Sequence, residues 1–293
     1  MEPNLARVCA WLQRNLRGET EMSEETIDVV SEDVKEALRK QFVSKRDETF
    51  RVRPSNLGRP LCQLQMEKRN TAGINPDYNF AMRMVLGDLV EAVLKGVIRE
   101  SGVPGYESSG RMTANISGEK ISGEYDLKID DKVYDIKSCS DWAFKKKFQS
   151  WGALKEDDAF GYVDQLHIYA KGHDNLPGGI WALNIATGQI NLIESTDTIE
   201  QQEQRLADIK DKIDKINSDA PFERCFEDIE ETFNKSATGN RRLGTTCSWC
   251  KYRFECWPGL QERESVFSKA KNKPMVSYTQ LNNLPEQESF DGS

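Results

Sequence analysis

The sequence contains few histidines and no long apolar run, and both absences restrict what the chain can do. Two histidines occur among 293 residues, which argues against histidine-rich hydrolytic metal sites and histidine-based nucleophile triads. No GxxxxGK[ST] motif occurs, so we expect no ATP-driven helicase in this chain. No stretch is long and apolar enough to span a bilayer, and the first residues lack a signal-peptide pattern. We therefore expect a cytoplasmic protein with no membrane partner.

The composition indicates a folded protein with a charged surface. Hydrophobic residues make up 38% of the chain, including 6 Trp and 12 Phe, which is enough to form a core, and charged residues make up 30%. The net charge of −8 is not typical of a nucleic-acid-binding protein, although a local patch or a bound metal sets the field at a binding site. In a reducing compartment, the seven cysteines indicate thiols or metal ligands rather than disulfides.

Hydrophobic periodicity and the positions of proline and glycine divide the chain into three parts. We expect an N-terminal helical segment over 1–50, a main domain over 51–265 and a loose polar tail over 266–293. Helical spacing predicts helices at 4–15, 23–42, 75–102, 157–171 and 197–217, and alternating residues predict a strand at 111–116 and a hairpin at 178–194.

Two short alternating runs at 120–129 and 132–136 form a predicted hairpin, with an Asp pair at the turn. Asp135 and Lys137 stand two apart on the second strand, so their side chains point to the same face. Asp126 lies near the end of the first strand. Two carboxylates and one ammonium could hold a hard divalent cation and polarise a water molecule beside it. The alternative is an exposed hairpin whose charged side chains are only solvated.

Helices on either side of the hairpin contribute further candidates. Glu91 and Asp88 are acidic residues of the run G-D-L-V-E on helix 75–102, and taken alone they would be solvated helical residues. Gln165 and Tyr169 are four apart and share a helical face, where an amide and a phenol could bind a phosphate, a water or a catalytic side chain. His167 lies off that face, and we expect it to be structural.

Three consecutive lysines, Lys145, Lys146 and Lys147, lie among four aromatic residues within 142–151. Basic groups interleaved with aromatics suit single-stranded nucleic acid, because the ammonium groups meet phosphates and the rings stack on bases. The alternative is an amphipathic helix whose aromatics face the core. We favour burial for most of the aromatics and DNA binding for the lysines.

Three closely spaced cysteines, Cys247, Cys250 and Cys256, form a C-x2-C-x5-C pattern near the end of the main domain. Cysteines at this spacing indicate a metal or cluster site, which could be four-coordinate zinc or an iron–sulfur cluster.

Three short motifs occur in order, namely G-E-Y-D at 123–126, D-I-K at 135–137 and Q-L-H-I-Y at 165–169. Together they resemble the GxxD, (D/E)xK and QxxxY motifs of the RecB-like branch of the PD-(D/E)XK nucleases. With the three cysteines and a lone upstream Cys62, the chain resembles the iron–sulfur RecB-like exonucleases. These include the CRISPR-associated exonuclease family and its phage relatives, and the nuclease domain of AddB is built similarly.

The resemblance implies a restriction-endonuclease-like α/β core, in which a mixed sheet is flanked by helices and an iron–sulfur cluster joins N- and C-terminal segments. It implies a metal-dependent DNA exonuclease acting on single-stranded or duplex ends, with possible protein partners in recombination or CRISPR adaptation. The implied catalytic residues are Asp126, Asp135, Lys137, Gln165 and Tyr169, the implied metal ligands are Glu91, Asp126, Asp135 and Ile136, and the implied ligands of a [4Fe–4S] cluster are Cys62, Cys247, Cys250 and Cys256.

The chain departs from the family at two of these positions, because Asp135 stands where Glu is usual and Glu91 where His is common. Both residues can bind a divalent cation, so the choice between Mg²⁺ and Mn²⁺ stays open. The competing hypotheses are a non-catalytic nucleic-acid-binding subunit and a zinc-binding interaction protein in which the hairpin charges have no role.

Overall fold

The computed structural model describes residues 2–44, 49–173, 175–218, 220–265, 267–268 and 270–282. Contacts divide the chain into two compact units, of which the first comprises 1–59 and 76–219 and the second comprises 60–75 and 220–293. Helix Leu61–Lys68 (α4) therefore folds with the C-terminal part of the chain. Among the described residues, no helix is long and apolar enough to cross a membrane.

A five-stranded mixed sheet forms the centre of the first unit. Its strand order is β1-β4-β5-β6-β7, and the bounds are Tyr106–Glu107 (β1), Leu127–Ile129 (β4), Lys132–Cys139 (β5), Leu176–Asn184 (β6) and Ile190–Glu194 (β7). Strands β5 and β6 run parallel, whereas the other neighbouring pairs are antiparallel. Gly110–Ile116 (β2) and Glu119–Tyr125 (β3) form a separate two-stranded sheet. This is the mixed α/β arrangement that the sequence predicted.

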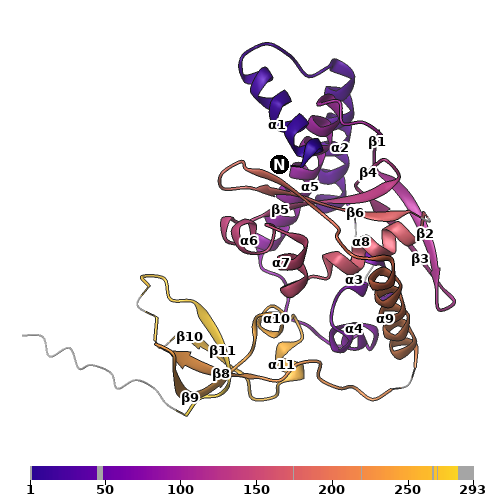
Figure 1. Cartoon of the computed structure of the whole chain (residues 1–293). Coiled ribbons are helices and arrows are strands. Elements are labelled where there is room, and N and C mark those ends of the chain that lie inside the picture. The colour runs from indigo at the N-terminus through magenta and orange to yellow at the C-terminus, as the bar shows by residue number, and fades with distance from the viewer. Residues whose placement is uncertain are drawn as a thin grey trace, which may run out of the picture. The chain divides into compact units, whose positions relative to one another are not determined.

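Helices cover both faces of this sheet (Figure 1). The helices of the first unit are Pro3–Leu16 (α1), Glu24–Phe42 (α2), Pro54–Leu57 (α3), Tyr78–Glu100 (α5), Asp141–Lys146 (α6), Trp151–Glu156 (α7), Tyr162–Lys171 (α8) and Ile199–Asn217 (α9). Of these, α1, α5, α6 and α8 contact the sheet, whereas α2 packs on α5 and α9 packs on α8. Apolar residues of α1 and α5 pack with Tyr134 and Ile136 of β5 and with Trp181 of β6 in one buried cluster. Because side chains alternate along a strand, Asp135 and Lys137 project to the face opposite Tyr134 and Ile136.

The predicted hairpin is present, with its turn at the Asp pair. Asp130 and Asp131 both have positive φ, at 47° and 60°, as a two-residue hairpin turn of the primed type requires. The expected first strand over 120–129 is not continuous, because it divides at Asp126 into β3, which pairs with β2, and β4, which pairs with β5. Asp126 therefore lies between the end of β3 and the start of β4 and belongs to neither strand.

The second unit contains a four-stranded antiparallel sheet of order β10-β11-β9-β8 and three short helices. The strands are Ile229–Phe233 (β8), Ser236–Arg242 (β9), Gln261–Glu264 (β10) and Met275–Gln280 (β11), and the helices are α4, Thr245–Ser248 (α10) and Arg253–Cys256 (α11). The buried Glu231 carboxylate accepts hydrogen bonds from the Tyr278 hydroxyl at 2.8 Å and from Asn240 Nδ2 at 2.9 Å.

The predicted helical segment over 1–50 contains α1 and α2, which pack against α5 within the first unit. One expectation about chain organisation needs correction. The expected loose tail over 266–293 contains β11, whose Tyr278 is buried beside β9. Sequence reasoning missed this strand because polar residues dominate its surroundings. Residues 283–293 of the predicted tail lie outside the described residues.

Candidate active site and cysteine group

Two carboxylates and one ammonium meet where β4, β5 and the break at Asp126 come together. The Asp126 Oδ2 atom accepts a hydrogen bond of 2.6 Å from the backbone N–H of Ile136, which holds this carboxylate against β5. Asp135 is almost fully buried and forms an ion pair with the Lys137 ammonium on the same face of β5. The structure thus brings together Asp126, Asp135 and Lys137, which the sequence had singled out.

Glu91 of α5 lies close enough to this group to influence it electrostatically. Its carboxylate is 3.2 Å from the ammonium of the buried Lys95, one helical turn further along α5. The alternative candidate Asp88 points elsewhere, since its two oxygens contact Lys40 at 3.0 Å and Gln41 at 2.7 Å on α2. Of the two acidic candidates on α5, Glu91 is the one that interacts electrostatically with Asp126.

Burial and mutual repulsion disturb the protonation of all these groups. Burial, followed by repulsion from Asp135, raises the pKa of Asp126 to about 7. Burial, followed by repulsion from Asp126, raises the pKa of Glu91 to about 7, and burial also raises the pKa of Asp135. Burial alone would lower the pKa of Lys137, but Asp135 and Asp126 outweigh it and raise that pKa. The raised pKa values mean that negative charge on these carboxylates is unfavourable in the folded protein. A bound divalent cation would stabilise that charge.

Helix α8 places Gln165 and Tyr169 beside the carboxylates. The Gln165 Nε2 atom donates a hydrogen bond of 2.9 Å to the Tyr169 hydroxyl, and the negative charges of Asp135 and Asp126 both act on that phenol. A Cβ atom added to Gly123 would lie 2.9 Å from the Tyr169 ring and 2.9 Å from Pro54 Cγ. The glycine of the G-E-Y-D motif is thus needed for the close packing of β3 against α8.

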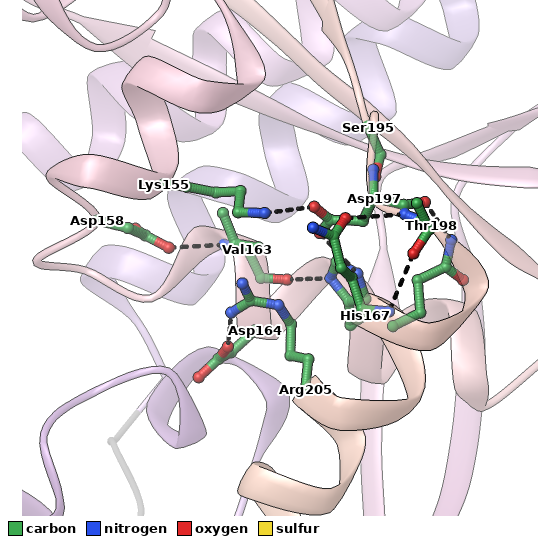
Figure 2. Close-up of polar contacts among 11 residues, drawn as sticks. Lys155, Asp158, Val163, Asp164, His167, Ser195, Asp197, Thr198 and Arg205 are labelled. Atoms are coloured by element: carbon green, nitrogen blue, oxygen red, sulfur yellow. Dashed lines mark hydrogen bonds and ion pairs between the residues drawn. The ribbon is translucent and has the colours of Figure 1, made fainter.

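A buried polar network fixes α8 in place (Figure 2). The His167 Nδ1 atom lies 2.8 Å from the Val163 carbonyl oxygen, and Nε2 faces Asp197 Oδ2 at 3.4 Å. Asp197 also accepts a hydrogen bond of 2.5 Å from the Lys155 ammonium. Burial lowers the pKa of His167. As expected, His167 lies away from the Gln165 and Tyr169 face and is structural.

The three lysines after β5 are not equivalent. Lys145 pairs with Asp141 at 2.7 Å, and Lys147 pairs with Asp157 at 2.9 Å. Lys146 is exposed, and it forms no ion pair within the part of the chain that the structure describes. Of the interleaved aromatics, Phe144, Phe148 and Trp151 are buried, whereas Trp142 remains 59% exposed. Burial of most of the aromatics is confirmed, and DNA binding by the lysines stays a prediction.

The cysteines of the predicted cluster gather within the second unit. Cys62 from α4 lines a cavity of about 20 Å³ together with Cys247, Cys250 and Cys256. The segment that follows α4 is hydrogen-bonded to the segment that carries these cysteines, because the Ile74 N–H donates a hydrogen bond of 2.8 Å to the Lys251 carbonyl oxygen. All four cysteines lie in the second unit, to which α4 belongs, and their binding of a cluster stays a prediction.

The donor atoms of both groups fit metals, although their side chains are not arranged as ready-made ligand sets. Within the described residues, no three His, Cys, Asp or Glu side chains form a group that could hold a metal ion as placed. The chemistry fits in both places, because mutually repelling buried carboxylates suit Mg²⁺ or Mn²⁺ and four thiols on one cavity suit zinc or an iron–sulfur cluster.

Three residues near these sites escaped sequence reasoning. Lys95 follows Glu91 by four positions, so helical spacing could have predicted their ion pair. The Tyr162 ring lies under the Lys137 ammonium, with the nitrogen 5.1 Å from the ring centroid, and nothing in the sequence indicated this contact. Cys225 lies beside Cys62, although it has no closely spaced cysteine neighbour in the sequence.

Comparison with known proteins gives little beyond this geometry. No family model matches the chain, and no curated protein matches it. The chain is similar to the crystal structure of SSO0001, with 16% sequence identity and a TM-score of 0.39, over 79% of this chain and 96% of that one. A likeness this distant does not identify a family.

Proposed function

We propose that the protein is a divalent-metal-dependent deoxyribonuclease with a PD-(D/E)XK core, and that it degrades DNA from its ends. The observation that carries the proposal is the meeting of the buried Asp135 with the half-buried Asp126 and Lys137, with Glu91 nearby. The three carboxyl groups outnumber the available ammonium groups, because Lys137 pairs with Asp135 and Glu91 shares Lys95 with Asp33, and this leaves negative charge for a cation to neutralise. A purely structural ion pair would not need the additional carboxylates.

The residues of the site have separable roles in the proposed reaction. Asp126, Asp135, Glu91 and the Ile136 carbonyl oxygen would hold Mg²⁺ or Mn²⁺, which when bound supplies Lewis-acid activation of water and of the phosphodiester. The Lys137 ammonium keeps its proton beside Asp135 and Asp126, so it acts as a fixed positive charge. It would orient the attacking water and stabilise the negative charge that develops on the phosphorane oxygens.

Gln165 and Tyr169 support this arrangement from α8. Because Tyr169 accepts the hydrogen bond from Gln165, its own hydroxyl proton remains available to a phosphate oxygen. Burial raises the pKa of Tyr169, so the phenol stays protonated and can act as a donor. We assign both residues to positioning the scissile phosphate rather than to proton transfer.

The proposed cofactor of the second unit is a [4Fe–4S] cluster bound by Cys62, Cys247, Cys250 and Cys256. The four thiols lining one cavity support a metal group of this kind. Anaerobically purified protein is expected to be brown and to contain iron and sulfide. A colourless protein loaded with zinc would replace the cluster by the zinc alternative.

End-labelled linear DNA and covalently closed circles, each incubated with Mg²⁺ or Mn²⁺, test the proposed activity. We expect linear DNA to be shortened and circles to be spared. Glu91→Gln should lose activity, whereas Asp88→Asn, one turn earlier on α5 but facing α2, should retain it. Rapid nicking of circles would refute action from ends, and equal activity of the two variants would remove Glu91 from the site.

A further inference from the structure

A fifth cysteine lies at the edge of the cysteine group in the second unit. The backbone N–H of Cys62 donates a hydrogen bond of 3.1 Å to the sulfur of Cys225. On either side of Cys225 the segment is fixed against the same group, since Arg224 Nε donates to the Cys256 carbonyl oxygen at 2.9 Å and Phe226 lines the cavity. The thiol is therefore held next to Cys62 from both sides.

The hydrogen bond to Cys225 comes from the first turn of a helix. Cys62 is the second residue of α4, where backbone N–H groups have no partner within the helix. The N-terminal end of a helix also favours negative charge. The N–H of Cys62 therefore holds the Cys225 sulfur at this helix end, beside the Cys62 side chain, and sulfur is a ligand of both zinc and iron–sulfur groups.

The sulfur of Cys225 completes a group of five cysteines from three segments. Cys62, Cys247, Cys250 and Cys256 line one cavity, and Cys225 contacts Cys62 at its edge. Cys225 is therefore placed beside the residue that would supply the fourth ligand.

We propose that Cys225 is a ligand of the metal group held by Cys247, Cys250 and Cys256, exchanging with Cys62 for the fourth position. Zinc and [4Fe–4S] groups take four protein ligands, so five thiols provide one more than is needed. The assignment rests on the proposed metal group, but not on its identity or on nuclease activity. It gives Cys225 a role that the C-x2-C-x5-C pattern does not assign.

Metal content of the full-length protein tests the proposal directly. Iron, sulfide and zinc per chain would be measured for the wild type, Cys62→Ala, Cys225→Ala and the double variant, all purified anaerobically. Cys9→Ala in the first unit serves as the control. We expect each single variant to keep most of its metal. The metal content of the double variant should be about tenfold lower than that of the wild type, because only three thiolates remain to bind the metal.

The remaining outcomes are also decisive. Loss of metal in Cys225→Ala alone would refute exchange with Cys62, because it would make Cys225 an obligatory ligand. Loss in Cys62→Ala with full retention in Cys225→Ala would overturn the proposal, as would full retention in the double variant. A wild type without iron or zinc would refute the metal group itself, whatever the nuclease assay shows.

Alkylation provides a second measurement that does not depend on how well the variants fold. Cys225 is exposed, so iodoacetamide should modify it readily unless its sulfur is bound. We expect peptide mass spectrometry to show Cys225 protected in the metal-loaded wild type and modified after treatment with a chelator. Equal modification before and after metal removal would contradict ligation by Cys225.

Discussion

Asp126→Asn should abolish nuclease activity and yet stabilise the metal-free protein at neutral to alkaline pH. The reason is that burial and Asp135 raise the pKa of Asp126 from 3.8 to about 7. Between these values, the folded protein holds a proton that the unfolded chain has released. The free energy of unfolding therefore falls as pH rises through this window and levels off above it. Asparagine does not ionise, so the variant lacks this loss.

The size of the effect follows from the size of the pKa shift. A shift of one unit corresponds to about 1.4 kcal/mol, so the full shift of Asp126 sets an upper limit of about 4 kcal/mol. Asp126 is partly exposed, and its charge is coupled to that of Asp135, so the realised effect is smaller. Between about pH 5 and pH 8, we expect the free energy of unfolding of the variant to rise by about 2 kcal/mol relative to that of the wild type. The amide oxygen of the substituted side chain can still accept the Ile136 N–H bond, so the local geometry should persist.

Urea unfolding in the presence of a chelator measures this advantage, and Trp181 provides the signal because it is fully buried in the first unit. Glu91→Gln should behave similarly, since the pKa of Glu91 is also raised to about 7, from 4.5. Asp88→Asn is the matched control and should show no such gain. If the stability of Asp126→Asn relative to the wild type does not grow with pH, the raised pKa of Asp126 is wrong. If this variant still cleaves DNA, the catalytic role of Asp126 is wrong.

Three further predictions concern the proposed catalytic site, its packing and the basic segment. Asp135→Ala and Lys137→Ala should each lower the cleavage rate by several orders of magnitude in a single-turnover assay, because each removes a charge from the reacting centre; wild-type cleavage by either would refute the site. Gly123→Ala should lower thermal stability by about 1–3 kcal/mol through overpacking, whereas Gly152→Ala, whose added Cβ atom meets nothing closer than 4.0 Å, should not. Replacing the lysines at 145–147 by alanine should reduce the salt dependence of DNA binding, and an unchanged slope would remove this segment from the interface.

The charged residues of the central hairpin could be placed from sequence because strand geometry is local. The two-residue period put Asp135 and Lys137 on one face, and the Asp pair specified the turn. The break at Asp126 could not be predicted this way, because the residues on both sides of it alternate like one continuous strand. What divides them is their pairing with two different strands, β2 and β5, and strand pairing is a property of the whole fold.

Contacts between distant segments explain the other differences between prediction and structure. The short helix α4 folds with the C-terminal part of the chain; the periodicity of its own sequence does not show this, and only the implied sharing of a cluster by Cys62 and the C-terminal cysteines pointed to it. Cys225 has no closely spaced cysteine and so falls outside the C-x2-C-x5-C pattern, yet the helix that follows Pro60 brings a backbone N–H to its sulfur. Spacing rules find ligands that lie within one or two turns of each other. A ligand supplied by a separate segment is found only when the contact that holds it is known. For this reason, the metal content of the Cys62 and Cys225 variants tests the ligand set, which the spacing of the cysteines alone does not define.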